Sequence, residues 1–210
     1  MSKLGKKLFD WIDHRIAKTC EVGQIDGIVL NDSRGLGDCF KTTIENSLRL
    51  IQQHDPRRYG RIKRYVSRIK NVVTPDGFTG GYNLSTRTIY LEFKEMSKLT
   101  DEDRAAIYAS VIIDKTTFGV LRRALKRKPS IHHSRIKNQI RTTRIRVNEH
   151  NRFLEKLVEA DLLSFPTFKL FHWEFDEKHQ PKISGKKKNF LMTLLSTIWR
   201  AAKEQIIKKK

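Results

Sequence analysis

The strongest constraint on the fold is a pair of long helices that the second half of the sequence predicts. Thr100 precedes three acidic residues and an apolar-rich stretch, and Thr100 with Asp103 has the spacing of a weak capping box. This first helix is expected to run to about Lys128, because Pro129 stops it. The second is expected over residues 132–162, where apolar residues recur at helical spacing. A chain with two such helices is expected to be predominantly helical.

The first half of the sequence alternates helical and β-prone segments. An amphipathic helix is expected over residues 3–18, followed by a β-prone stretch at 24–30. Another helix is expected to start with Asp38 as its N-cap. Residues 86–93 predict a half-buried strand, because every second residue is apolar. The alternating residues of that strand are Ile89, Leu91 and Phe93.

The end of the sequence predicts an aromatic-rich loop at 165–175 and then a basic-flanked helix at 188–207. Together these elements indicate an α+β protein in which a small sheet precedes the helix that starts near Thr100. We expect three segments along the chain. They are an N-terminal helix with a β-prone and turn-rich stretch at 1–37, a core at 38–163, and a C-terminal loop and helix at 164–210.

Charge is the second strong feature of the sequence. The 210 residues contain 43 Lys and Arg against 23 Asp and Glu, a formal net charge of +20, which favours a polyanionic partner. With 38% apolar residues the chain can bury a core. Cys20 and Cys39 are too few for a disulfide framework and lack metal-ligand spacing, although the sequence leaves a single bridge open. We therefore expect an intracellular, cytoplasmic protein, with no secretory signal or transmembrane segment.

Five short motifs follow one another along the middle of the chain. They are Asp-Pro-Arg-Arg-Tyr at 55–59, Gly-Gly-Tyr at 80–82, Thr-Ile-Tyr-Leu at 88–91, an apolar helix at 109–119, and a basic helix reading Arg-Ile-x-Val-x-Glu-x-x-x-Phe-Leu at 144–154. This order, over about residues 40–157, resembles a group of small zincin-like proteins with a gluzincin-type arrangement. In that group a strand pair leads into a His-Glu-x-x-His helix, and a later helix supplies the third zinc ligand. The resemblance implies a zincin-like fold.

The resemblance also implies that the metal site has degenerated. It assigns the first histidine to Asp114, the glutamate to Lys115 and the second histidine to Phe118, and the third ligand falls near Thr143. Only Asp114 can ligate a metal, whereas a zinc site needs three or four protein ligands. The implied protein is a pseudo-metallopeptidase without metal or cofactor. We expect Asp114 and Lys115 to meet separate partners, with Lys115 approaching Glu149 or another carboxylate in the place of the metal's charge.

Two basic blocks predict a surface that binds nucleic acid. The span 115–148 contains no Asp or Glu, and a second block runs from 57 to 70. Arginine forks bind phosphates, and Tyr59 and Tyr65 in the second block are candidates for stacking on bases. No recognised nucleic-acid motif is present, so we expect contacts to the backbone. The residues expected at this interface are Arg57, Arg58, Arg61, Arg64, Arg122, Arg123, Lys126, Arg127, Lys137, Arg141 and Arg144.

The leading expectation is thus a non-catalytic zincin-like protein that binds a polyanion, nucleic acid, through its basic surface. One alternative is an interaction module that attaches to an anionic membrane through the helices at 4–16 and 190–207, or to an acidic protein. A second alternative is a hydrolase with a rebuilt, non-standard site. The residues available for such a site are Asp114, His132, His133 and His150.

Overall fold

The computed structural model describes the chain over residues 20–73, 80–94, 96, 98–127, 135–175 and 181–183. Side chains are described within these ranges, except at 125–127, 135–139, 174–175 and 181–183. The helices expected at 3–18 and 188–207 lie outside the described residues. None of the helices in the described ranges combines the length and the apolar character that crossing a bilayer requires.

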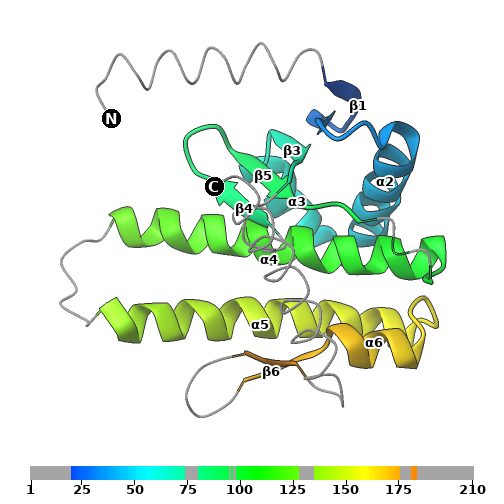
Figure 1. The fold of residues 1–210 in the computed structure, drawn as a ribbon. Helices are drawn as coiled ribbons and strands as arrows, with labels where there is room; N and C mark the ends of the chain where they lie inside the picture. The colour runs from blue at the N-terminus through cyan, green and yellow to red at the C-terminus, as the bar shows by residue number, and fades with distance from the viewer. Residues whose placement is uncertain are drawn as a thin grey trace, which may run out of the picture.

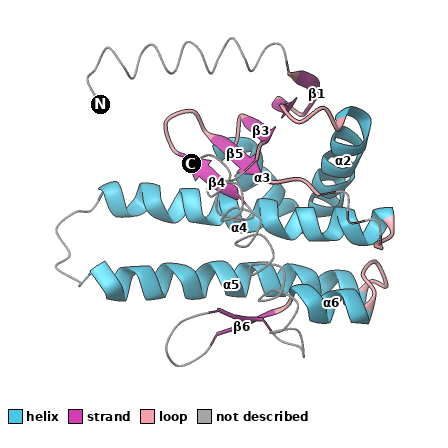
Figure 2. Ribbon diagram, viewed as in Figure 1, coloured by secondary structure: helices cyan, strands magenta, loops and turns pink. Residues whose placement is uncertain are grey.

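Helices dominate the described part of the chain, and its strands form a five-stranded sheet and a separate two-stranded pair (Figures 1 and 2). The helices are α2 (Gly37–His54), α3 (Pro56–Tyr65), α4 (Asp101–Arg127), α5 (Arg135–Glu159) and α6 (Phe165–Phe171). The strands are β1 (Glu21–Ile25), β2 (Ile28–Asp32), β3 (Arg68–Asn71), β4 (Gly80–Asn83), β5 (Thr88–Leu91), β6 (Trp173–Phe175) and β7 (Pro181–Ile183). The predicted α+β class is confirmed, as is a small sheet that precedes the helix starting near Thr100.

The five-stranded sheet has the order β1-β2-β3-β5-β4 and is mixed. Its three inner strands run parallel, and β1 and β4 are antiparallel edges. Leu30, Ile69 and Ile89 are aligned by the pairing register, so they point to the same face of the sheet. All three are fully buried and share one core with apolar residues of α2 and α4. Helices therefore cover this face. The strand order also shows that β1 and β2 belong to the same sheet as β3, β4 and β5.

A tight hairpin joins β1 to β2. The two central residues, Asp26 and Gly27, both have positive φ, at 47° and 82°. Asp-Gly is a preferred pair for this turn, because both positions need left-handed backbone. The interpretation of residues 24–30 as one β-prone stretch is therefore incomplete, since the turn divides it into the ends of two strands.

Helix α2 begins at Gly37, and the prediction that Asp38 is its N-cap is wrong. The N-cap position is Leu36, whose side chain makes no capping hydrogen bond. The amide of Gly37 instead donates to Oδ2 of Asp32 at 2.6 Å, and Asn71 donates to Oδ1 of Asp32 at 2.7 Å. A buried carboxylate at the end of β2 thus holds both the start of α2 and the end of β3.

Helix α4 begins and ends where the sequence predicts. The amide of Asp103 donates to Oγ1 of Thr100 at 3.0 Å, which confirms the cap, and the helix ends at Arg127, shortly before Pro129. In Figure 1 α4 lies between α5 and the layer of α2 and the sheet, and it packs against both α2 and α5. A Cβ atom at Gly119 would lie 2.4 Å from Cε1 of Tyr82, so α4 approaches β4 as closely as glycine allows.

The aromatic segment after α5 is not the loop that the sequence predicts. It forms α6 and β6, because Ser164 caps α6 and Pro166 occupies its first turn. Asp103 of α4 accepts hydrogen bonds from the amide of Ser164 at 3.1 Å and from Oγ1 of Thr167 at 3.0 Å. These contacts dock the start of α6 on the start of α4.

Candidate nucleic-acid interface

The α4 positions that the resemblance assigns to the two histidines both contact Arg146 of α5. Its Nε and Nη2 donate to the two carboxylate oxygens of Asp114, both at 2.7 Å. Its Cζ lies 4.9 Å from the centroid of the Phe118 ring. Nζ of Lys115 lies 3.2 Å from Oδ2 of Asp114. On α5, Arg146 is thus the residue that faces these two α4 positions. Thr143, where the third ligand is expected, lies on α5 almost one helical turn before Arg146.

Burial and charge act against each other in this cluster. Burial alone would raise the pKa of Asp114, but the hydrogen bonds from Arg146 and the charge of Lys115 hold it below its ordinary value. Burial lowers the pKa of Lys115, and Asp114 offsets this only in part. A bidentate pair between Arg146 and Asp114 is a strong, directional contact. The cluster therefore fastens α4 to α5.

Glu149 is not the partner of Lys115. It accepts a hydrogen bond from Nε of Arg58 at 2.8 Å, and Nη1 of Arg61 lies 3.5 Å away. Lys115 meets a different carboxylate, that of Asp114. The prediction that these two neighbours have separate partners is wrong, because the long lysine side chain reaches back to the adjacent residue.

A second ion-pair cluster joins α3 to α5. Arg58 contacts both Glu149 and Asp55, and Nζ of Lys156 lies 3.0 Å from Oδ2 of Asp55. Asp55 also caps α3 by accepting from the amide of Arg58 at 3.1 Å. The Arg58 side chain is only 11% exposed. Arg58, one of the residues expected at the interface, therefore serves as a link between helices.

Arginines from α3 and α4 converge on Tyr65 at the C-terminal end of α3. The guanidinium carbons of Arg64 and Arg123 lie 5.8 and 5.7 Å from the centroid of its ring. Nη2 of Arg87, in the turn before β5, donates to the carbonyl oxygen of Arg64 at 2.6 Å. Tyr82 of β4 donates its hydroxyl to the carbonyl oxygen of Tyr65. Three elements distant in sequence are thus held around one aromatic ring.

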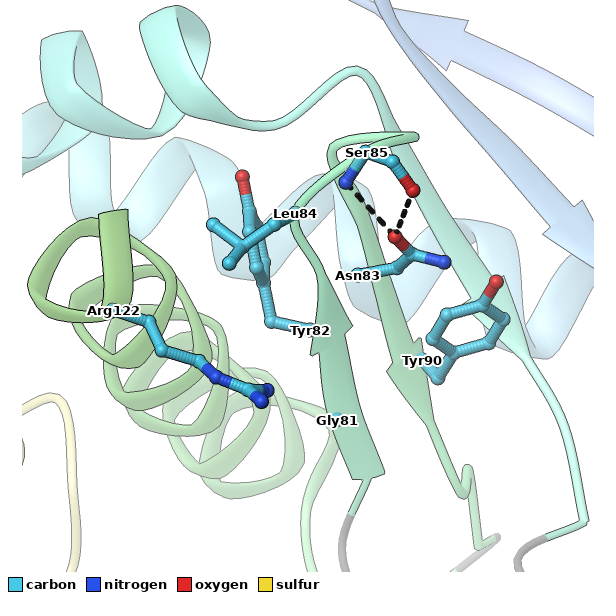
Figure 3. A pocket seen from close by; sticks show the side chains of 7 residues that line it. All are labelled: Gly81, Tyr82, Asn83, Leu84, Ser85, Tyr90 and Arg122. Carbon is cyan, nitrogen blue, oxygen red and sulfur yellow. Dashed lines mark hydrogen bonds between the residues drawn. The ribbon is translucent and has the colours of Figure 1, made fainter. Parts of the chain in front are cut away.

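Two hollows flank this arginine–tyrosine cluster. One, of about 560 Å³, lies between α3, α4 and α5, with Arg61, Arg64 and Tyr65 among its lining residues. The other, of about 460 Å³, lies beside the β4–β5 hairpin and is bordered by Arg122 (Figure 3). We call the surface formed by Arg61, Arg64, Tyr65, Arg122 and Arg123 the arginine surface. It brings together four of the arginines expected at the interface.

The remaining expected residues lie elsewhere or outside the described side chains. Arg57 is exposed at the start of α3, and Arg141 and Arg144 are exposed three residues apart on α5. The side chains of Lys126, Arg127 and Lys137 are not described, although their backbones lie in α4 and α5.

The two candidate stacking tyrosines have different environments. Tyr59 is buried and donates its hydroxyl to Oδ2 of Asp26 at 2.7 Å, so it belongs to the core. Burial and that hydrogen bond raise its pKa well above the ordinary value for tyrosine. Tyr65 is half-buried and borders the larger hollow. Of the two, Tyr65 is the one whose ring lies on the arginine surface.

Of the four residues available for a rebuilt hydrolytic site, Asp114 and His150 lie in the described part of the chain. The imidazole of His150 is buried, with Nε2 3.0 Å from the carbonyl oxygen of Phe171 and its ring edge-to-face with Trp173. Burial lowers its pKa. His132 and His133 lie outside the described residues. Within the described part of the chain no three His, Cys, Asp or Glu residues are grouped so as to hold a metal ion, and Cys20 and Cys39 are not joined by a disulfide.

Sequence reasoning missed three residues that shape these sites: Arg87, Tyr90 and Arg146. The sequence could have indicated that Arg146 points towards the other helices. It lies three residues before Glu149 and four before His150, so it shares their helix face. The position of Tyr90 is shown only by the pairing of β4 with β5, and that of Arg87 only by its hydrogen bond to the carbonyl oxygen of Arg64.

Comparison of the chain with protein-family models, with curated proteins and with solved structures found no match. The fold and the site by themselves define an α+β protein with a small mixed sheet, a helix pair fastened by ion pairs, and an arginine surface at the C-terminal ends of α3 and α4.

Proposed function

We propose that this chain is a non-catalytic zincin-like protein that binds nucleic acid through the phosphates, using the arginine surface. The observation that carries the proposal is that Arg61, Arg64 and Arg123 lie at or beside Tyr65, while Arg122 borders the neighbouring hollow. Arginine forks on a basic surface match the geometry of phosphate oxygens. A formal charge of +20 adds a long-range attraction for a polyanion.

The arginines differ in how much of their charge is neutralised within the protein. Arg58 and Arg146 are held in short ion pairs with Glu149 and Asp114. Among the described residues, no carboxylate forms an ion pair with Arg64, Arg122 or Arg123. Contacts with an aromatic ring keep the positive charge of an arginine available to an anion. Arg64, Arg122 and Arg123 of the arginine surface are therefore suited to bind phosphate, whereas Arg61 shares Glu149 with Arg58. The ion pairs between helices contribute to stability.

The non-catalytic part of the proposal is supported by the side chains at the motif positions. Phe118 cannot bind a metal, and Arg146 satisfies both carboxylate oxygens of Asp114. Elemental analysis of the purified protein tests this part. We expect well below one zinc per chain, and one zinc per chain would contradict it.

Salt dependence of binding tests the phosphate contacts. We expect the full-length protein, stripped of nucleic acid, to bind a labelled duplex with an affinity that falls steeply with salt. Arg64→Gln and Arg123→Gln should each reduce the slope of log K against log salt by about 1, because each removes about one phosphate contact. Lys98→Gln is the matched control. Lys98 is exposed just before the N-terminal end of α4, whereas Arg123 lies near its C-terminal end, so the loss of the Lys98 charge should change the slope little.

The melting temperature of each variant is measured alongside, since Arg64 and Arg123 also contact Tyr65. An exposed cation–π contact contributes only about 0.5–1 kcal/mol, so both variants are expected to fold. If neither duplex nor single-stranded nucleic acid binds at low salt, or if the slopes for the two variants equal that of Lys98→Gln, the proposal is overturned.

A further inference from the structure

The hollow beside the β4–β5 hairpin has a floor without a side chain. Gly81 of β4 lies directly opposite Tyr90 of β5 in the pairing register. Tyr82, the next residue along β4, points to the other face of the sheet and packs against Gly119 of α4. Because Gly81 has no side chain, the outer face is open next to the Tyr90 ring. In Figure 3, Gly81 on β4 lies between the side chains of Tyr90 and Arg122, which both border the hollow.

The openness of this hollow does not come from backbone strain at its floor. A Cβ atom built on Gly81 meets no other atom within 4 Å, and its φ lies outside the positive range. Gly80 is different: its φ is +123°, and a Cβ there would lie 1.8 Å from the carbonyl oxygen of Tyr90. The backbone therefore needs glycine at 80, whereas at 81 glycine only leaves space. That space has a volume of about 460 Å³, within the range of roughly 300–1,000 Å³ common for ligand pockets.

The walls of the hollow offer three kinds of contact. Tyr90 supplies an aromatic ring that is partly exposed, and Leu84 supplies an apolar side chain. Arg122 is exposed, with its guanidinium carbon 5.5 Å from the centroid of the Phe118 ring. Oδ1 of Asn83 accepts from the amide and the hydroxyl of Ser85, at 2.9 and 2.7 Å. Figure 3 shows the amide nitrogen of Asn83 directed away from Ser85, where it can donate to a ligand.

We propose that this hollow binds an unstacked nucleobase of single-stranded nucleic acid. The base stacks on Tyr90 above Gly81, the amide of Asn83 donates to its edge, and Arg122 binds a neighbouring phosphate. A base inside a duplex is stacked on both faces and cannot enter, so the hollow distinguishes single strands from duplexes. The inference rests on the proposed nucleic-acid function and adds the form of nucleic acid that the surface prefers.

An abasic strand separates the contribution of the base from that of the phosphates. We would measure binding of the full-length protein to labelled oligo(dT), to an abasic strand of the same length, and to a duplex, at one salt concentration. Stacking of one base on an aromatic ring should make oligo(dT) bind about fivefold or more tightly than the abasic strand. Gly81→Val fills the floor with a side chain that suits a strand, and it should remove this difference.

Two further variants test whether Tyr90 and Arg122 contact the ligand. Tyr90→Ala should also abolish the preference for oligo(dT), while leaving the abasic strand and the duplex bound as before. Arg122→Gln should weaken all three ligands, because it removes a phosphate contact, whereas Lys98→Gln should weaken none appreciably. Melting temperatures show that each variant is folded, and photo-crosslinking of iodouracil in the strand reports the contact directly, with Tyr90 as the expected site.

The outcomes separate this inference from the proposed function. A preference for oligo(dT) that is lost in both Gly81→Val and Tyr90→Ala supports the nucleobase pocket. Equal binding of oligo(dT) and the abasic strand, or a preference that survives in Gly81→Val, overturns the pocket and leaves phosphate binding intact. If none of the three ligands binds at low salt, the proposed function itself is overturned, and the pocket with it.

Discussion

Removal of the Arg146 side-chain charge is expected to weaken the junction between α4 and α5. In Arg146→Met the aliphatic part of the side chain remains to pack on Phe118, but Asp114 loses both of its 2.7 Å hydrogen bonds. Breaking a fully buried ion pair costs about 3–5 kcal/mol. Here the Arg146 side chain is 25% exposed and the Asp114 side chain 17%, and Lys115 stays 3.2 Å from Asp114. We therefore expect a smaller loss, about 2 to 3 kcal/mol in the free energy of unfolding.

The neighbouring arginine provides a matched control. Arg144 is exposed on the same helix, so Arg144→Met should change the free energy of unfolding by less than about 0.5 kcal/mol. Chemical denaturation of both variants gives this free energy, and for a chain of this size a loss of 2 to 3 kcal/mol corresponds to a decrease of about 4 to 12 °C in the melting temperature. A double-mutant cycle with Asp114→Asn isolates the coupling, which we expect to be about 1 kcal/mol or more.

The stability that Arg146→Met loses should depend on pH, because it depends on the charge of Asp114. The folded-state pKa of Asp114 lies below its ordinary value of 3.8, so the stability that its carboxylate contributes is fully present above that value. It is lost as the pH falls through the lowered pKa. The difference between the native protein and Arg146→Met should therefore shrink below about pH 4. If Arg146→Met and Arg144→Met unfold alike at pH 7, or if the cycle shows no coupling, this account of the helix junction is refuted.

Three other substitutions give predictions of different sign and origin. Lys115→Met removes a buried charge beside a carboxylate that Arg146 already neutralises, so denaturation should show unchanged stability or a gain of about 1 kcal/mol, and a clear loss would show that the lysine charge is needed. Gly119→Ala should lower the melting temperature although alanine favours helices, because its Cβ would lie 2.4 Å from Tyr82, and a higher melting temperature would contradict the close packing. Asp103→Ala should cost about 1–3 kcal/mol, since it leaves the donors of Ser164 and Thr167 without their acceptor, and unchanged stability would argue against the docking of α6.

Features that depend on neighbouring residues were predictable from the sequence. The cap at Thr100 and the end of α4 before Pro129 both depend on residues within one or two turns. The same holds for the strand in which Ile89, Leu91 and Phe93 are buried, because alternation along a strand is a local pattern. Such signals act on the backbone before any tertiary contact forms.

Local signals also failed where a distant residue provided the better partner. Asp38 is well placed in the sequence to cap α2, yet Asp32 of β2 bonds the first amide of that helix. Glu149 is expected from the sequence as a partner for Lys115, yet Arg58 of α3 donates a hydrogen bond to that carboxylate. In both cases the competing group lies on another element, so its distance depends on how the elements pack.

The sequence by itself determined the helical content, the α+β class, the basic charge and the lack of a full set of metal ligands at the positions that the resemblance assigns. Only the tertiary structure decided which arginines neutralise carboxylates and which gather on the arginine surface. It also placed Gly81 opposite Tyr90 and brought Arg122 to the border of the same hollow. The physical reason is that charge and periodicity are properties of the chain, whereas a contact between side chains depends on the register of strands and the packing of helices, which are set by the whole core.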